Sequence, residues 1–368
     1  MNDDRLVLFD LDFTLYEAYG NWRRPLAGLF RRNLGTKAFP WTLYFDIRGH
    51  NEVFEIFYEK SFRHHWLTAE LAALLILLFE KRISATALLN DLQSIEFRLD
   101  LLKRIFPRPG SYALEAKKYC LSFPTFRSAI EGVKERSTSP QVVDVVSRYS
   151  DSLRFRAYPG VVEALEFLKE RGIPFYLASE GDYDQQRFKC KLLGLDGYFS
   201  QRTLASEIYK LNRCYRASRK TIEDALADGS YSGEMDSPGI RQADEEVRRF
   251  ELLKHKEDFH YYISALNAID SDRDNPEEFL RTVDSDDVLT TNIDLPSGVI
   301  MVGDRNDKDM YPVWQLLKEK ALLIRMRAGK YKNDPRSPDI PRGQYAECPE
   351  FRQVYTRLRK TFTVRRSL

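Results

Sequence analysis

The chain has 368 residues, of which 43% are hydrophobic and 13% aromatic. This is enough apolar material for one large or two ordinary packed domains and too much for a disordered protein. The 57 basic and 55 acidic side chains give a net charge of +2. The overall charge therefore favours neither nucleic acid nor an anionic membrane as a partner, and no nucleic-acid partner is expected.

The cysteines and the hydrophobic segments indicate the compartment. Four scattered cysteines lack the spacing of a metal site, which is typical of reduced thiols. The first residues, MNDDRLVLF, are too acidic and too short in apolar length for a signal peptide. Residues 67–80, LTAELAALLILLFE, contain Glu70 and are too few for a membrane span, so they predict a buried helix. We expect a soluble cytoplasmic protein with no membrane partner.

The first half of the chain predicts one strand followed by helices. Leu6–Phe9 is a short apolar run of the kind found in a central parallel strand. Residues 20–150 show apolar side chains at helical spacing in several stretches and predict a helical unit. Pro159 and Gly160 then precede a predicted helix that ends near Gly172. The apolar sequence IPFYLA follows as a second buried strand.

The second half is more polar. Residues 201–295 are charge-mixed and read as a polar insertion, with an exposed loop at 227–239 and a helix over 259–269. Residues 299–302 and 321–326 restore the strand pattern. The proline-rich tail after them is expected to be mostly irregular. The pattern as a whole predicts an α/β fold, a Rossmann-like doubly wound parallel sheet.

Polar side chains follow three of the predicted strands. They are Asp10 and Asp12 after the first, Ser179 after the second, and Asp304 and Asp309 after the third. Ligands of open parallel sheets bind outside the carboxyl ends of the strands, so neighbouring strands would bring these groups together. Four crowded carboxylates need a cation, and their hard oxygens suit Mg²⁺. Magnesium beside a carboxylate nucleophile is an arrangement used for phosphoryl transfer.

These motifs resemble those of the haloacid dehalogenase superfamily. The matching pieces are DLDFT at 10–14, the serine that ends FYLAS at 175–179, and VGDRNDKD at 302–309. YPGVVEALEFLKERGI resembles that family's helix before the second motif. The resemblance implies the family's sheet core at 1–19 and 151–368, with the polar insertion at 201–295. It also implies that the helical unit at 20–150 is a large cap of the family's first type.

The resemblance also implies catalytic roles. Asp10 would attack phosphorus and form an aspartyl-phosphate. Asp12 would protonate the leaving oxygen and then deprotonate the hydrolytic water. Thr14 would brace the turn, although an ordinary capping hydroxyl explains it equally well. Ser179 and the backbone N–H groups that follow it would hold phosphate oxygens.

The backbone N–H groups that would hold phosphate oxygens belong to Glu180 and Gly181. The resemblance further implies that Asp304 would complete a Mg²⁺ site with the Asp10 carboxylate and the backbone carbonyl of Asp12. Asp309 would support that site, although a helix-start acid also explains it.

The family's active-site lysine is harder to place, because the interval from Ser179 to Asp304 is unusually long. Lys256 directly precedes the predicted helix at 259–269 and has the best context. Lys254 and Lys210 remain alternatives.

An acid at position 12 favours a phosphatase over a dehalogenase, because a halide leaves without a proton. The leading hypothesis is a Mg²⁺-dependent phosphatase of a small phosphorylated metabolite, which is the expected partner. Two alternatives stay open: a phosphatase of nucleotides or nucleic-acid ends, and a non-catalytic binding or regulatory module.

Overall fold

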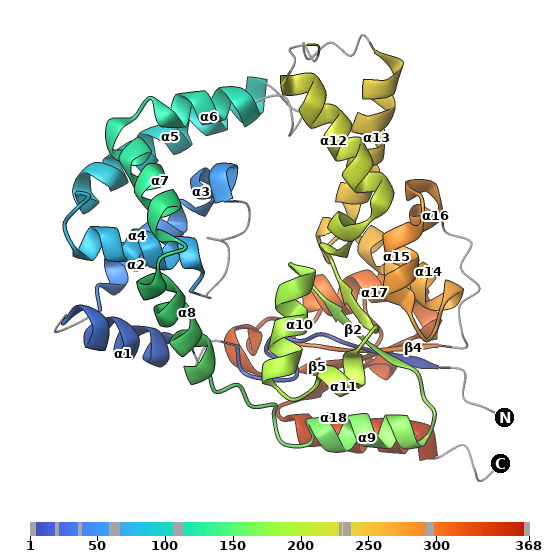
Figure 1. Ribbon diagram of the computed structural model, residues 1–368. Coiled ribbons are helices and arrows are strands. Elements are labelled where there is room, and N and C mark those ends of the chain that lie inside the picture. Colours follow the sequence, from blue (N-terminus) through green and yellow to red (C-terminus); the bar gives the residue numbers. More distant parts are fainter. Residues whose placement is uncertain are drawn as a thin grey trace. The chain divides into compact units, whose positions relative to one another are not determined.

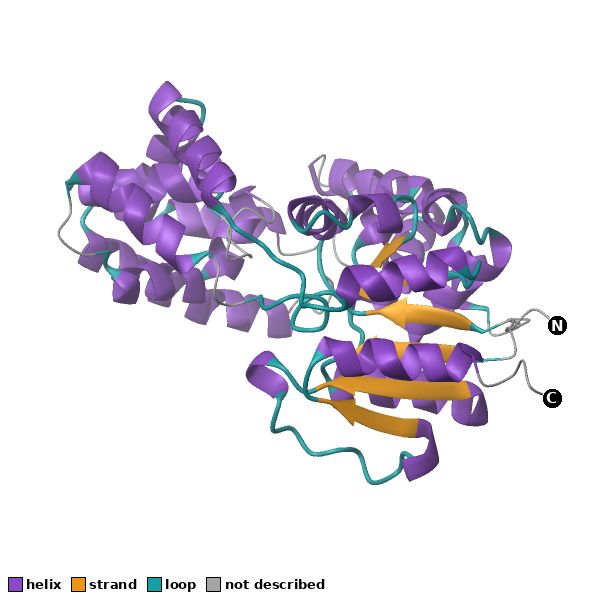
Figure 2. Ribbon diagram, turned by 90° about the horizontal axis from the view of Figure 1, so that it is seen from below, coloured by secondary structure: helices purple, strands orange, loops and turns teal. Residues whose placement is uncertain are grey.

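The structure of the protein is a computed structural model, and it describes residues 5–18, 22–35, 39–58, 67–105, 113–227, 230, 237–290 and 298–363. The chain divides into two compact units. Unit 1 comprises residues 1–19, 154–221 and 241–368, and unit 2 comprises residues 20–153 and 222–240. The strands all belong to unit 1, whereas the described part of unit 2 is built of helices (Figure 2).

Unit 1 contains a six-stranded parallel sheet in the order β3-β2-β1-β4-β5-β6. The strands are β1 Leu6–Phe9, β2 Phe175–Ser179, β3 Thr203–Ala205, β4 Val299–Gly303, β5 Ala321–Met326 and β6 Tyr345–Cys348. In the register, Val7 lies beside Phe175 on one side and Ile300 on the other. The predicted strands that end in polar side chains are therefore neighbours, with β1 between the other two.

Helices cover both faces of the sheet, so the predicted doubly wound α/β fold is confirmed (Figure 1). Side chains of β1 pack against helices on both faces, because successive side chains of a strand point to opposite faces of the sheet. Leu6 and Leu8 join one core cluster with side chains of α14 (Phe259–Ser271) and α17 (Tyr311–Leu317). Phe9 contacts the rings of Phe199 and Phe351 on the other face.

The remaining helices of unit 1 follow the strands in the manner of an α/β fold. They are α9 Val161–Glu170, α10 Tyr183–Leu192, α11 Asp196–Phe199, α15 Pro276–Thr282, α16 Ser285–Leu289 and α18 Phe351–Thr363. Two longer helices, α12 Arg213–Ala227 and α13 Pro238–Glu251, are divided between the two units.

Unit 2 is an aromatic-rich helical body. Its helices are α1 Arg23–Leu34, α2 Trp41–Gly49, α3 Asn51–Tyr58, α4 Ala69–Phe79, α5 Ala85–Ile105, α6 Ala113–Leu121, α7 Pro124–Arg136 and α8 Pro140–Ser152. The apolar helix α4 is buried from Leu71 to Leu78 and packs on α7 and α8, as predicted for a core helix. At Gly132 of α7, an added Cβ would lie 2.9 Å from Leu77, so the glycine permits close helix packing. Within the described residues, no helix combines the length and apolar character needed to cross a membrane.

Two expectations differ from the structure. The tail is not mostly irregular, because it contains β6 and the amphipathic helix α18, whose Phe351, Val354 and Leu358 are buried. The 201–295 segment contains the strand β3 and several helices, and residues 222–240 of it fall in unit 2. The predicted loop at 227–239 lies largely outside the described residues.

Candidate active site

The two aspartates after β1 sit in a tight turn. The Asp10 N–H donates to the Val302 carbonyl at 2.8 Å, which continues the pairing of β1 with β4. Phe13 then adopts a positive φ of 61°, rare for an aromatic residue and a mark of local strain. The Thr14 hydroxyl donates a hydrogen bond to Asp10 Oδ2 at 3.2 Å, so Thr14 stabilises the turn by linking its two ends. Asp10 and Asp12 both line a cavity at this edge of the sheet.

Three carboxylates crowd together at the centre of the site. One oxygen from each of Asp10, Asp304 and Asp309 lies within 4.8 Å of the others, and all three residues are buried. Burial, outweighing the attraction of Lys256, raises the pKa of Asp10 to about 7. Burial and the neighbouring carboxylates Asp10 and Asp309 raise the pKa of Asp304 to about 9. The cluster is therefore short of positive charge.

The chemistry of this cluster fits a divalent cation. Asp304 Oδ2 is buried without a hydrogen-bond partner, although buried polar atoms are normally satisfied. Several hard carboxylate oxygens around one point are the ligands that Mg²⁺ prefers. Asp10, Asp304 and Asp309 each offer a carboxylate oxygen to such an ion.

Asp309 is held by the backbone after β4. Its Oδ2 accepts the N–H groups of Asp304 at 3.1 Å and Arg305 at 3.0 Å. It lies in the π-helical turn Asn306–Met310 and approaches Gly303 closely. A Cβ at Gly303 would lie 2.5 Å from the Asp309 carboxyl, so only glycine allows this contact.

Lys256 supplies positive charge inside the cluster. Its side chain is 1% exposed, and Nζ donates to Asp10 Oδ1 at 2.9 Å and to the Ala178 carbonyl at 3.0 Å. Nζ also forms an ion pair with Asp309. Burial alone would lower the Lys256 pKa, but the two carboxylates raise it well above its ordinary value. The two carboxylates therefore favour the charged form of Lys256.

The two alternative lysines lie elsewhere. Lys210 forms an ion pair with Glu207 at 3.0 Å, and Lys254 is half-buried at the end of the 3-10 helix Leu252–Lys254. Neither lines the cavity that Lys256 lines.

Ser179 ends β2 on the same cavity, which has a volume of about 200 Å³. The Gly181 N–H donates to Ser206 Oγ at 2.7 Å, so this group is engaged within the chain rather than presented to a phosphate. The cavity thus brings together most of the residues expected at the site, while Thr14 and Gly181 lie outside its lining. The lining residues are Asp10, Asp12, Phe13, Ser179, Glu180, Lys256, Asp304, Arg305, Lys308, Asp309 and Tyr331.

Comparison with known protein families agrees with this geometry. A family profile described as haloacid dehalogenase-like hydrolase matches residues 5–227, which is more than half of the chain. The chain belongs to the haloacid dehalogenase-like hydrolases. No similar sequence was found among curated proteins.

Solved structures show a general likeness to this hydrolase. The magnesium-bound HAD-type protein YfnB of Bacillus subtilis is 11% identical with a TM-score of 0.38, covering 96% of this chain and 98% of its own. A structure assigned as a β-phosphoglucomutase of Thermotoga maritima is 13% identical with a TM-score of 0.38, covering 97% and 99%. A haloacid dehalogenase-like protein of Burkholderia xenovorans is 14% identical with a TM-score of 0.37, covering 96% and 95%. The family assignment rests on the family profile alone.

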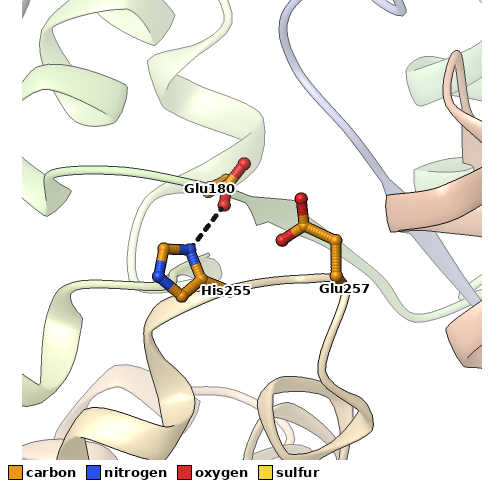
Figure 3. Close-up of side chains that lie close together, drawn as sticks. All are labelled: Glu180, His255 and Glu257. Carbon is orange, nitrogen blue, oxygen red and sulfur yellow. Dashed lines mark hydrogen bonds and ion pairs between the residues drawn. The ribbon is translucent and has the colours of Figure 1, made fainter.

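A network of charged side chains borders the cavity of the hydrolase. Glu180 points toward His255 and lies near Glu257 (Figure 3), and His255 Nδ1 is 3.4 Å from a Glu180 oxygen. Lys308 forms ion pairs with both Glu180 and Glu257. The Glu180 side chain is thus held at the rim by a lysine that sequence reasoning did not single out. The only sequence signal for Lys308 is its position one residue after Asp307 in the third motif.

Two further residues contact Asp12. Lys189 Nζ lies 2.6 Å from Asp12 Oδ2, and the Tyr16 hydroxyl donates to Asp12 Oδ1 at 2.5 Å. Neither was predicted from the sequence. Tyr16 sits two residues after the first motif and Lys189 ten residues after Ser179, and no family motif marks either position.

Proposed function

We propose that this haloacid dehalogenase-like hydrolase cleaves phosphate monoesters of small metabolites, with Mg²⁺ as its cofactor. The observation that carries the proposal is the buried cluster in which Lys256 lies between the carboxylates of Asp10 and Asp309, with Asp304 beside them. A carboxylate nucleophile, a buried cation and further carboxylates that can hold a metal are the groups that phosphoryl transfer requires.

The Asp10 and Asp304 carboxylates, together with the Asp12 backbone carbonyl, would hold the Mg²⁺ ion, and Asp309 would support them. When bound, the ion supplies positive charge to the phosphate oxygens and so offsets their repulsion by the carboxylates. Asp309 also anchors the loop after β4 through its two backbone hydrogen bonds.

Asp10 acts as the nucleophile in this proposal. Its Oδ2 accepts the Thr14 hydroxyl and its Oδ1 accepts Lys256, so the carboxylate has a fixed orientation toward the cavity. The attack forms a bond between an Asp10 oxygen and phosphorus and breaks the bond from phosphorus to the leaving oxygen. Lys256 and the Ser179 hydroxyl stabilise the negative charge that the phosphoryl group carries during transfer.

Asp12 moves the protons. It gives one proton to the leaving oxygen in the first half of the reaction and takes one from water in the second. Asp12 suits this role because its side chain is 32% exposed and lines the cavity beside Asp10. An acid at this position has no use in dehalogenation, where the leaving halide needs no proton.

Unit 2 would act as the cap. Its residues 20–153 are inserted in the chain between Asp12 and Ser179. A cap that closes over such a site excludes water and limits access to small substrates, which favours metabolites over folded proteins.

Hydrolysis of p-nitrophenyl phosphate tests the proposal, with the wild type in Mg²⁺ or in EDTA beside an Asp10→Asn variant. We expect Mg²⁺-dependent turnover that falls at least about a thousandfold in Asp10→Asn, as when a catalytic nucleophile is removed. Asp339→Asn, at an exposed carboxylate, is the matched control and should keep wild-type activity. Failure of the wild type on this substrate and on a broad panel of metabolite phosphates would reject the proposal.

A further inference from the structure

Both oxygens of the Asp12 carboxylate accept a hydrogen bond from a buried donor. Lys189 Nζ lies 2.6 Å from Oδ2, and the Tyr16 hydroxyl lies 2.5 Å from Oδ1. The two donors come from different parts of unit 1, Tyr16 from the turn after β1 and Lys189 from α10. Charge-assisted hydrogen bonds on both oxygens fix the rotation as well as the position of a carboxylate.

Lys189 is a buried lysine, 8% exposed, and a buried ammonium is costly unless it is paired. The helix that carries it is firmly held. The Asp182 side chain caps α10 by accepting the Gln185 N–H, and Arg187 bonds the Phe199 carbonyl and pairs with Asp196. Lys189 therefore presents its ammonium to Asp12 from a rigid support.

Tyr16 is equally constrained. Its side chain is 1% exposed, and its ring packs edge-on against Phe155 with centroids 5.4 Å apart. Its backbone bridges to Asp12 on one side and to Ala157 on the other. The hydroxyl thus has little freedom to leave the Asp12 carboxylate.

Neither donor lines the catalytic cavity, whereas Asp12 does. The contacts of Lys189 and Tyr16 with the cavity therefore run through Asp12. We propose that Lys189 and Tyr16 are positioning residues that hold the Asp12 carboxylate in place to take the proton from the hydrolytic water. The inference rests on the proposed phosphatase function.

The step that depends on this positioning is the second half of the reaction. The water oxygen forms a bond to phosphorus, Asp12 accepts one water proton, and the bond between phosphorus and Asp10 breaks. The products are the free Asp10 carboxylate and inorganic phosphate. A misplaced base slows this step, and a displacement of about 1 Å can cost a hundredfold.

p-Nitrophenyl phosphate separates the two halves of the reaction, because nitrophenolate is a stable anion that leaves without a proton. Losing the positioning of Asp12 should spare the first half and slow the second, so the covalent enzyme accumulates. Such accumulation appears as a burst of product before the steady state.

The experiment is stopped-flow measurement of p-nitrophenol release by wild type, Lys189→Met, Tyr16→Phe and Lys191→Met. Lys191 is an exposed lysine on the same helix and is the matched control. For Lys189→Met we expect a burst approaching one product per active site, followed by a steady state roughly 10- to 100-fold slower than wild type. Tyr16→Phe should change in the same direction, and Lys191→Met should match the wild type.

Two outcomes would overturn the inference. A Lys189→Met enzyme with the wild-type steady-state rate and no added burst would overturn the inference. So would a slower steady state without any burst in both variants, which indicates a structural role only. Should Lys189→Met fail to fold, Tyr16→Phe, which keeps the buried ring, carries the test alone. A wild type without Mg²⁺-dependent turnover would instead reject the proposed function.

Discussion

Removal of the Lys256 side chain should destabilise this protein strongly. It is buried and bonds to Asp10 and Asp309 at once. Lys256→Met would leave these carboxylates without their partner, which typically costs 3–5 kcal/mol, so we expect about that loss in the free energy of unfolding. Urea unfolding monitored by circular dichroism measures it.

Lys254→Met is the matched control, since Lys254 is half-buried two residues away and does not line the cavity. We expect it to change stability by less than about 0.5 kcal/mol and to keep activity. A large effect of Lys254→Met together with a small effect of Lys256→Met would show that the wrong lysine has been assigned.

The thiols give a second prediction at the level of single residues. Burial raises the pKa of both Cys120 and Cys190 to about 12. At pH 8 only about one thiol in ten thousand would then be the reactive thiolate. We expect iodoacetamide to label both at least about a hundredfold more slowly in the native protein than in guanidinium, with native rates rising about tenfold per pH unit. Peptide mapping by mass spectrometry reads this out, and rapid native labelling of Cys190 would contradict it.

Among the secondary-structure elements, β5 carries an unusual side chain. Arg325 is 0% exposed, and its guanidinium donates to the carbonyls of Asp304, Tyr331 and Asp334. It therefore links the segment after β5 to the loop that bears Asp304, one of the proposed metal ligands. That segment contributes Tyr331 to the wall of the cavity.

Arg325→Met should release this segment. We expect a loss of about 3 kcal/mol in stability, because several buried carbonyls lose a charged donor. Hydrogen exchange across residues 327–344 should increase more than elsewhere in unit 1. Arg342→Met, at an exposed arginine of the same segment, should leave exchange unchanged. Unaltered exchange in Arg325→Met would contradict the proposed tie.

The elements also show what the sequence could reveal. Apolar runs predicted β1, β2, β4 and β5, and the polar residues at their ends predicted the convergence of Asp10, Ser179 and Asp304. By contrast, β3 has three residues and β6 is a half-exposed edge strand, so neither produces a clear hydrophobic run. The amphipathic period of α18 was present in the sequence, but it follows a proline-rich stretch that indicated irregular structure.

The partners of Asp12 could not be predicted, for a physical reason. Lys189 reaches Asp12 only because α10 packs beside the sheet, and the two residues are 177 positions apart. The sequence alone does not distinguish a buried lysine such as Lys189 from a solvent-exposed one. Lys256 could be favoured only because it directly precedes a recognisable helix.

At the scale of the whole molecule, the family profile ends at residue 227, whereas Lys256, Asp304 and Asp309 lie beyond it. Strand β4, next to β1 in the sheet, brings Asp304 and Asp309 to Asp10, and the segment before α14 brings Lys256 there. All proposed metal-binding residues consequently belong to unit 1.

This allocation predicts where Mg²⁺ protects the protein. We expect added Mg²⁺ to slow hydrogen exchange in peptides around residues 6–15, 252–258 and 299–310, and to leave the helices α4 and α7 of unit 2 unaffected. At a concentration of one hundred times Kd, the ion should stabilise the fold by about 2.7 kcal/mol. Asp304→Asn should abolish both effects. Equal protection of α4 would contradict the assignment of the site to unit 1.

The central position of β1 also affects how the protein can be made. One edge of β1 pairs with β4, in which Val299 is the partner of Leu6. During synthesis this edge of β1 therefore has no partner until the ribosome has made residue 299. At a synthesis rate of roughly 5–20 residues per second, that interval is about 15 to 60 s. Throughout it, the nascent chain holds an apolar strand with an unpaired edge, a template for association with other chains. Heterologous expression should therefore benefit from lower temperature or added chaperones, even though the finished sheet buries that edge completely.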